Sequence, residues 1–360
     1  MKQVDTLMRH AISDKVFPGA VLLVARDDSI VFFEAYGYAN ILSRCKMTID
    51  TIFDLASLTK PLATTLAVMR LIQQRKLGLE QRLESILPCF KKTDKGQIKI
   101  KSLLCHNSGL PAYREYYYKL SKLPHDARRK ALESLLAKES MSHPLRKKVL
   151  YSDPGFMILG WVVETVSGRR LDYYVSDEIY KPLGIDSGRG LFFVDLNSKP
   201  TTGRFAATEI CPWRNILLEG VVHDENAYMM GGIAGHAGLF GSAGSLHILL
   251  SSLLSVFHGS PSINLFGKDL LHTFFKQQEG TDKALGFETP SLANSSCGDY
   301  FSKRSVGHLG FTGTSFWMDI KRNIIVILLT NRVHPSREND KIKSFRPKVH
   351  NAVMDCFLNQ

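Results

Sequence analysis

A serine and a lysine stand three residues apart in Ser57-Leu58-Thr59-Lys60, directly before an apolar, helix-forming segment from Leu62 to Gln74. Positions i and i+3 share one face of a helix, so the lysine amine can reach the serine hydroxyl and take its proton. A cation such as Lys60 in the first turn of a helix is also unfavourable, because it opposes the helix dipole. Residues that depart from such local preferences are typical of functional sites. The pair therefore predicts a nucleophilic serine with a lysine as its base.

The Ser-x-x-Lys pattern alone is weak, because a chain of this size contains about one copy by chance. A second copy, Ser43 to Lys46, lies in a polar connection with no apolar periodic segment behind it. Only Ser57 precedes a segment with helical spacing of its apolar residues. The alternative is that Ser57 merely caps a helix and Lys60 is a solvated charge, and this stretch by itself leaves both interpretations open.

The composition is that of a globular protein, with 44% hydrophobic and 22% charged residues and no solenoid repeat. The formal charge of +12 suggests nucleic acid, but the basic residues are scattered and no nucleic-acid-binding motif is present. A modest preference for anionic substrates is the most that this charge indicates. We expect a small molecule or short peptide as substrate and no nucleic acid, and the oligomeric state is open.

No apolar run approaches the roughly 18–20 residues that a membrane span requires, and the first residues do not lead into a signal-peptide core. The six cysteines are far apart and include no Cys-x-x-Cys pair, which is typical of free thiols in a reducing compartment. We therefore expect a cytoplasmic protein, or a periplasmic or secreted one if a signal sequence has been removed.

Strands are predicted at both ends of the chain and helices mainly between them. Apolar, β-rich segments occupy 19–26 and 30–36, and later ones occupy 304–311, 315–320 and 324–331. Helical patterns occupy 2–14, 116–139, 156–166, 173–179, 243–257 and 342–357. Short turns between successive strands imply antiparallel pairing, so the predicted fold class is α+β.

The two chain ends must then meet in one antiparallel sheet flanked by helices. We expect residues 1–76 and 284–360 to form this α/β lobe and residues 77–283 to form a mainly helical lobe, the two making one catalytic unit. The cleft between the lobes is the natural place for an active site.

Two further motifs follow Ser57 and Lys60: Tyr151-Ser152-Asp153, and His308-Leu309-Gly310 in a late strand. This order resembles that of serine β-lactamases and penicillin-binding proteins. Over nearly its whole length the chain is most similar to the class C β-lactamase-related branch, which includes esterases, D-amino-acid-specific peptidases and D-alanyl-D-alanine carboxypeptidases. The resemblance implies a β-lactamase/transpeptidase-like fold.

The resemblance also implies a role for each motif. Ser57 would attack an acyl carbon and form an acyl-enzyme, and Lys60 would act as base if burial or neighbouring charge lowers its pKa. Tyr151 is the second candidate for proton transfer. The N–H of Phe311, together with that of Ser57, would form the oxyanion hole, while Gly310 leaves room for the substrate backbone.

Two positions depart from the family pattern. Many relatives carry Tyr-x-Asn, and here Asp153 takes the place of the amide; a carboxylate would accept an N–H or hold Lys60 charged. The third motif is His-x-Gly rather than Lys-Thr-Gly. A neutral His308 at the edge of the cleft binds a carboxylate less tightly than a lysine does, which argues against an efficient β-lactamase.

Plainer interpretations stand beside these roles. Taken singly, Tyr151 is a packing aromatic and His308 a partly exposed surface residue. His106 and His236 could ligate a metal, but no third ligand has a suitable spacing. We therefore expect no metal and no other cofactor, and we expect His106 to hold its loop by hydrogen bonds.

The leading hypothesis is a serine hydrolase that acts through an acyl-enzyme on an amide or ester. The stretches 235–240 and 311–315 resemble a subgroup found near muropeptide-recycling enzymes, so a cell-wall-derived peptide or muropeptide is the preferred substrate class. A carboxylesterase or weak β-lactamase is the alternative within enzymes. A non-catalytic binding or assembly module on the same fold is the alternative from another class.

Overall fold

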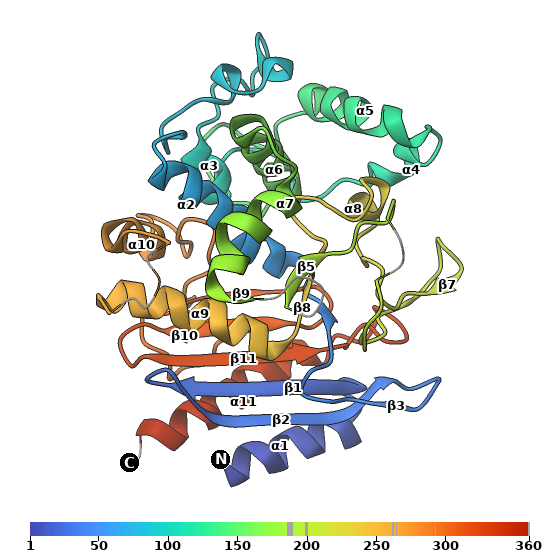
Figure 1. Ribbon diagram of the computed structural model, residues 1–360, viewed down its shortest axis with the longest axis vertical. Helices are drawn as coiled ribbons and strands as arrows, with labels where there is room; N and C mark the ends of the chain where they lie inside the picture. Colours follow the sequence, from blue (N-terminus) through green and yellow to red (C-terminus); the bar gives the residue numbers. More distant parts are fainter. Residues whose placement is uncertain (186–189, 199–200, 261–262, 264, 292, 359–360) are drawn as a thin grey trace.

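The computed structural model describes residues 1–185, 190–198, 201–260, 263, 265–291 and 293–358. Its base is a six-stranded antiparallel sheet in the order β3-β2-β1-β11-β10-β9 (Figure 1). The strands are β1 (Gly19–Arg26), β2 (Ser29–Asn40), β3 (Cys45–Lys46), β9 (Val306–Leu309), β10 (Ser315–Asp319) and β11 (Ile324–Thr330). β1 and β11 pair at the centre, so the two ends of the chain meet in one sheet, as predicted.

Both faces of this sheet are covered by helices. Side chains of β1 alternate between the faces, as the period of two in a strand requires. Ala20, Leu22 and Val24 pack in one core cluster with α1 (Lys2–Ser13) and α11 (Ile342–Leu358). Val21, Leu23 and Ala25 belong to the larger core, which lies on the side of α9 (Ala243–His258) (Figure 1).

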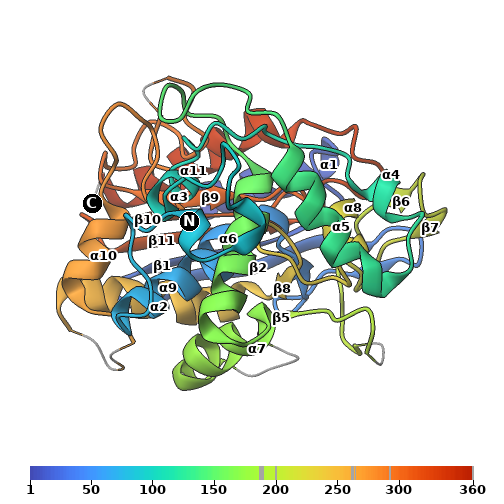
Figure 2. The ribbon, with the colours of Figure 1, turned by 90° about the horizontal axis from the view of Figure 1, so that it is seen from above.

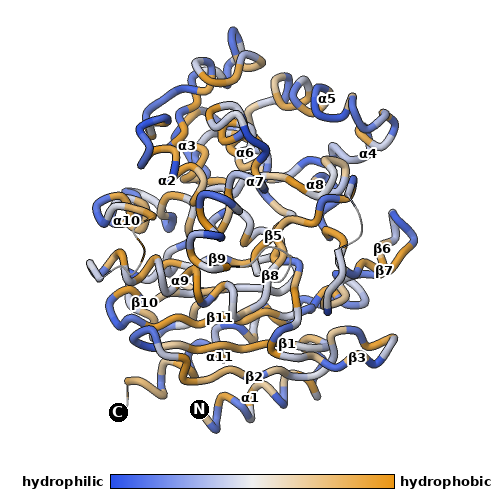
Figure 3. Tube along the Cα trace, viewed as in Figure 1, coloured by the Kyte–Doolittle hydropathy of each residue, from blue (hydrophilic) through white to orange (hydrophobic). Residues whose placement is uncertain are grey.

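The middle of the chain forms the helical part above the sheet. Seen from above, α6 (Asp153–Ser167) lies among the helices at its centre and contacts α2 (Leu66–Gln73), α3 (Ile100–Leu104) and α7 (Leu171–Val175) (Figure 2). Hydrophobic residues concentrate along α6 and the sheet, whereas the outer helix α5 (His125–Lys138) is largely hydrophilic (Figure 3). The remaining helices are α4 (Tyr117–Leu120), α5 (His125–Lys138), α8 (Glu225–Met229) and α10 (Lys268–Phe275).

Several predicted elements differ from the structure. The helical pattern over 116–139 is two helices, α4 and α5, because Pro124 cannot continue a helix and instead precedes α5 in an extended conformation. Helix α10 was not predicted. A small sheet of β4 (Phe53–Asp54), β8 (Leu239–Gly241) and β5 (Leu191–Phe193), and a pair β6 (Ile210–Cys211) and β7 (Ile216–Leu217), were also missed. Strands of two or three residues are too short to leave a periodic pattern.

The helix after Ser57 is irregular where regular helix was predicted. Ala56–Leu58 form a 3₁₀ turn and Lys60–Thr65 a wide π-helical turn before α2 begins. Such π turns are frequent at functional sites. Within the described residues, no helix is long and apolar enough to cross a membrane.

Candidate active site

The turn that carries Ser57 is held by hydrogen bonds on both sides. Ala56 has a φ of 46°, a conformation that L residues rarely adopt. Its N–H donates to the Asp54 carboxylate at 2.8 Å, and its carbonyl accepts from the Thr59 hydroxyl at 2.6 Å. The Leu55 N–H donates to the carbonyl of Leu239 in β8, at 2.9 Å. The surrounding structure therefore stabilises a strained turn that places Ser57 at the cavity wall.

Lys60 is fully buried, and three oxygen atoms lie within contact distance of its ammonium group. It donates to Ser57 Oγ at 3.0 Å and to the backbone carbonyl of His236 at 3.0 Å. The third is Asp153, whose Oδ1 lies 2.7 Å from Nζ. The predicted contact between Ser57 and Lys60 is present, and Lys60 is bound there as a charged group.

The expectation that the surroundings lower the pKa of Lys60 is wrong. Burial on its own lowers this pKa, but the negative charge of Asp153, helped by Tyr151, outweighs burial and raises the pKa to about 12. The physical reason is the departure already visible in the second motif: a carboxylate occupies the place of the usual amide. Asp153 holds Lys60 charged, which was one of the two roles foreseen for it.

Tyr151 lies close to two imidazole rings. Its ring centroid is 4.6 Å from that of His106 and 6.0 Å from that of His308. Its hydroxyl interacts with Ser57 and Lys60, and burial raises its pKa to about 12, so the phenol is neutral at pH 7. The His106 Nδ1 accepts the Ser152 N–H at 3.0 Å, so His106 holds its loop by a hydrogen bond, as expected.

His308 is buried, with 2% of its surface exposed, so its interpretation as a surface residue is wrong. Its Nδ1 lies 2.8 Å from the Leu309 carbonyl oxygen. Burial, and then the charge of Lys60, lower the pKa of His308 to about 3. The third motif therefore presents a neutral imidazole near neutral pH, as the sequence suggested.

The turn after β9 is tied to the turn that carries Ser57. The Thr312 hydroxyl donates to the Asp54 carbonyl at 2.7 Å, and the Thr314 hydroxyl to the Leu55 carbonyl at 3.1 Å. A Cβ on Gly310 would lie 2.1 Å from Thr314 Oγ1 and 2.7 Å from the Leu55 oxygen. This close approach is a reason for glycine at 310 in addition to the predicted room for substrate.

Two cavities meet at Ser57 and Tyr151, with volumes of about 600 and 380 Å³. The larger is also lined by His308, Gly310 and Phe311, and the smaller by Asp153 and Phe311. Lys60 lies behind Ser57 and in contact with it. The structure thus brings all seven predicted site residues to one place, whereas the second Ser-x-x-Lys copy ends in the edge strand β3 and lines neither cavity.

Several polar residues of the site were not predicted. In the smaller cavity, His236 Nε2 lies 2.9 Å from the Asp224 carboxylate. Burial by itself would raise the pKa of Asp224, but the adjacent His236 and the N–H of Ala227, which donates to this carboxylate, stabilise the anion and lower the pKa overall. In the larger cavity, Arg332 and Arg346 are buried. His236 stands in the stretch 235–240, which carries part of the family resemblance, whereas the two arginines left no pattern in the sequence.

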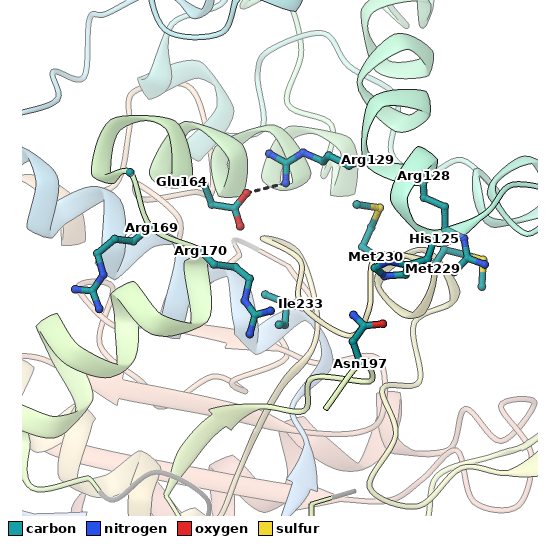
Figure 4. Close-up of a pocket in the computed structure, with 11 residues that line it drawn as sticks. His125, Arg128, Arg129, Glu164, Arg169, Arg170, Asn197, Met229, Met230 and Ile233 are labelled. Atoms are coloured by element: carbon teal, nitrogen blue, oxygen red, sulfur yellow. Dashed lines mark hydrogen bonds and ion pairs between the residues drawn. The ribbon is translucent and has the colours of Figure 1, made fainter. Parts of the chain in front are cut away.

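A third cavity, of about 500 Å³, lies elsewhere between α5, the end of α6 and the segment after α8 (Figure 4). Its basic side chains are mostly neutralised: Arg129 pairs with Glu164 at 2.7 Å, and Arg170 pairs with Asp172 at 2.7 Å. No serine, threonine or cysteine is among the described residues that line it. This cavity is therefore no candidate for nucleophilic catalysis.

The described residues contain no group of three or more His, Cys, Asp or Glu side chains arranged to hold a metal ion. The chemistry that the arrangement supports is acyl transfer: a serine hydroxyl in contact with a lysine–carboxylate pair and a tyrosine, at the junction of two cavities.

Comparison with known proteins agrees with this fold and site. A family model described as Beta-lactamase matches residues 4–346. The chain is 36% identical over 366 residues to the N-acetylmuramyl-L-alanine amidase of Bacillus subtilis (strain 168), covering 93% of this chain and 81% of that protein. It is 32% identical over 373 residues to a putative D-alanyl-D-alanine carboxypeptidase of Salmonella gallinarum, covering 95% and 85%.

Among solved structures, EstCE1, described as a hydrolase with promiscuous acyltransferase activity, superposes with a TM-score of 0.73 at 22% identity, over 96% of this chain and 98% of that one. At this identity the likeness bears on the fold alone, and it confirms the predicted α+β architecture. The chain belongs to the beta-lactamase family and is a serine hydrolase of that family.

Proposed function

We propose that this enzyme cleaves an amide bond in a cell-wall-derived peptide or muropeptide through an acyl-enzyme on Ser57. The observation that carries the proposal is the contact of Ser57 Oγ with Lys60 Nζ, which in turn pairs with Asp153. The substrate class is supported by the names of the relatives, an N-acetylmuramyl-L-alanine amidase and a putative D-alanyl-D-alanine carboxypeptidase.

In this proposal the Lys60–Asp153 pair works as one base. The pair is an ammonium and a carboxylate in the free enzyme. A substrate that covers the cleft removes water and weakens the ionic form relative to the neutral one. One proton then moves from Lys60 Nζ to the Asp153 carboxylate, and the resulting amine accepts the proton of Ser57 Oγ as this oxygen attacks the carbonyl carbon.

Tyr151 completes the proton path. Its neutral hydroxyl donates a proton to the leaving nitrogen as the amide bond breaks, and Lys60 returns to it the proton taken from Ser57. The second half reverses these steps with water in place of the amine: the proton of water passes to Lys60 through Tyr151, and Ser57 regains its own. The N–H groups of Ser57 and Phe311 would bind the carbonyl oxygen, and losing one such donor costs about 3–4 kcal/mol.

Intact-mass spectrometry after exposure to a fluorophosphonate probe tests the acyl-enzyme. We expect one adduct on Ser57 in the native protein and none in Ser57→Ala, with Ser43→Ala labelled as fast as the native protein. Absence of any adduct with fluorophosphonate or penicillin would overturn the proposed mechanism.

The substrate class is tested separately, by liquid chromatography of purified muropeptides incubated with the enzyme. Release of an amino acid or peptide that requires Ser57 supports the proposal. Turnover of p-nitrophenyl acetate together with inertness toward muropeptides and D-amino-acid peptides would instead identify a carboxylesterase.

A further inference from the structure

The carboxylate of Asp54 is buried beside the turn that carries Ser57 and joins this turn to a distant segment. Asp54 ends the short strand β4 and is 2% exposed. Its Oδ1 accepts the Ala56 N–H at 2.8 Å, and its Oδ2 accepts the N–H of His223, just before α8, at 2.6 Å. No lysine or arginine among the described residues pairs with this carboxylate. Burial raises its pKa, and the two N–H groups offset that rise only in part, so a neutral residue would avoid a considerable cost.

The two N–H groups that are expected to form the oxyanion hole are not engaged elsewhere. Ser57 and Phe311 line both cavities, where these meet. Neither of their backbone N–H groups donates to an acceptor among the residues that the structure describes. The two donors come from turns that are distant in the sequence, so their separation depends on the contacts that tie the two turns together.

Asp54 contacts both turns. Its carboxylate binds the N–H of Ala56, the residue before Ser57, which has a φ of 46°. Its backbone carbonyl accepts the hydroxyl of Thr312, the residue after Phe311, at 2.7 Å. One residue therefore binds the sequence neighbour of each expected oxyanion donor.

The second carboxylate oxygen restrains the Phe311 side by another route. His223, whose N–H this oxygen accepts, packs its imidazole against the ring of Phe311, with the centroids 5.5 Å apart. The same imidazole is oriented by Glu209, whose Oε2 lies 3.1 Å from Nε2. The carboxylate thus holds the Ser57 turn with one oxygen and the residue that packs on Phe311 with the other.

An asparagine could not replace this carboxylate. Its amide has a single acceptor atom, and its NH₂ group would face one of the two N–H groups, donor against donor. A cap of the Ser57 turn would need only the oxygen that binds Ala56. The cap alone therefore does not account for a carboxylate at this position, whereas the additional bond to His223 does.

We propose that Asp54 is a positioning residue that fixes the separation of the two oxyanion-hole N–H groups, those of Ser57 and Phe311. The inference rests on the proposed function and deepens it, because it assigns the geometry of the oxyanion hole to a side chain that lines neither cavity. An oxyanion is stabilised only when both donors lie about 2.7–3.1 Å from it, so a small displacement of either turn weakens one hydrogen bond severely.

Phosphorus nuclear magnetic resonance of the fluorophosphonate adduct on Ser57 tests this inference. The phosphonyl oxygen of the adduct takes the place of the oxyanion, so the difference in phosphorus chemical shift between the folded and the urea-denatured adduct reports its hydrogen bonds. In Asp54→Asn we expect this difference to fall by about half or more, because one of the two hydrogen bonds is lost. We also expect labelling to slow by about 10²-fold, as for the loss of one donor.

Asp319→Asn is the matched control. Asp319 is also buried, its carboxylate accepts the N–H groups of Ser302 at 2.9 Å and Arg322 at 3.1 Å, and it lines neither cavity. This variant should lose stability but keep the native resonance and labelling rate. A folded Asp54→Asn that also keeps the native resonance would show that Asp54 has a structural role only, and would overturn the inference.

Should Asp54→Asn fail to fold, Thr312→Val provides a second test. This substitution removes only the hydroxyl that links the Phe311 turn to the Asp54 carbonyl. We then expect the resonance of the folded adduct to move toward the denatured value. An unmoved resonance would count against Asp54.

Failure of this inference and failure of the proposed function are distinguishable. A native protein that forms no adduct on Ser57 would overturn both. A normal adduct whose resonance is the same in Asp54→Asn would overturn the inference alone. Because the probe is no cell-wall compound, an enzyme that proves inert toward muropeptides would lose the proposed substrate class while Asp54 keeps its role.

Discussion

At the scale of single residues, the proton state of the site depends on what stands at position 153. With an asparagine at this position, burial would dominate the pKa of Lys60 and would favour the neutral amine. Asp153 instead forms an ion pair with Lys60 at 2.7 Å, and the ammonium also donates to Ser57 Oγ and to the His236 carbonyl. With an amide at position 153, Lys60 could act as a base directly as the neutral amine. With the carboxylate of Asp153 there, Lys60 is an ammonium ion that must first lose a proton.

Asp153→Asn should therefore shift the pH dependence of Ser57 labelling to lower pH. With Asp153 present, the pKa of Lys60 is raised to about 12, so the neutral amine is scarce below that pH and labelling accelerates throughout the accessible alkaline range. Without the carboxylate, burial lowers the pKa, and the rate should reach its plateau at lower pH. Stopped-time mass spectrometry with a fluorophosphonate from pH 6 to 10 measures this.

The matched control for that shift is Asp177→Asn, which removes a carboxylate on the outer surface that pairs with Lys181. Its profile should coincide with that of the native protein. A profile of Asp153→Asn that also coincides with the native one would show that Asp153 does not govern the charge of Lys60.

Lys60→Ala should slow Ser57 labelling by about 10²–10⁴-fold, the range that a positioned general base contributes. The protein should stay folded, as circular dichroism can verify, because Asp153 is partly exposed and can be solvated. Lys46→Ala is the natural control, since it alters the other Ser-x-x-Lys copy. Equal labelling rates in the two variants would exclude Lys60 as the base.

At the scale of helices and strands, the sequence predicted the elements whose apolar residues recur with a regular spacing within a short segment. The strands around 19–36 and 306–330 alternate or run apolar and are joined by short turns, so their antiparallel pairing followed. The ion pair of Asp153 with Lys60 depends on how α6 abuts the helix after Ser57, and no spacing in the chain encodes that packing. The same holds for Arg346, whose partners are carbonyls of a turn distant in sequence.

The contact between α6 and the glycine-rich segment before β8 also positions Lys60. A Cβ on Gly235 would lie 2.1 Å from the Phe156 carbonyl oxygen in α6. The Gly235 carbonyl accepts the Thr64 hydroxyl at 2.6 Å, and the next carbonyl accepts Lys60. The absence of a side chain at 235 thus allows the segment to deliver two acceptors to the π-helical turn.

Gly235→Ala should lower the free energy of unfolding by about 1–3 kcal/mol through overpacking, and should slow Ser57 labelling as the segment moves away from Lys60. Denaturant unfolding and probe labelling measure the two effects. Gly78→Ala, where an added Cβ would meet no atom within 4 Å, should change stability by less than about 0.5 kcal/mol. Unaltered stability and labelling in Gly235→Ala would mean that the close approach does not constrain the site.

At the scale of the whole molecule, the sheet joins residues from both ends of the chain, and the helical segment between them contributes to the same site. Asn331, directly after β11, connects these parts. Its Oδ1 accepts the Gly19 N–H of β1 at 2.9 Å. Its Nδ2 donates to the Ala39 carbonyl of β2 at 3.0 Å and to the carbonyl of Ala207, in the middle of the chain, at 3.3 Å.

Asn331→Ala should therefore destabilise the molecule as a unit. The substitution leaves buried backbone groups of three segments without partners, at about 1–3 kcal/mol for each group that water does not reach, so we expect a loss of about 2–4 kcal/mol in the free energy of unfolding. Urea unfolding followed by fluorescence and by far-ultraviolet circular dichroism should shift together, because the sheet cannot close without either chain end. Lys321→Ala, at an exposed position in the turn between β10 and β11, should leave both curves in place. If the two probes separate in Asn331→Ala, the sheet and the helical part unfold independently and Asn331 does not couple them.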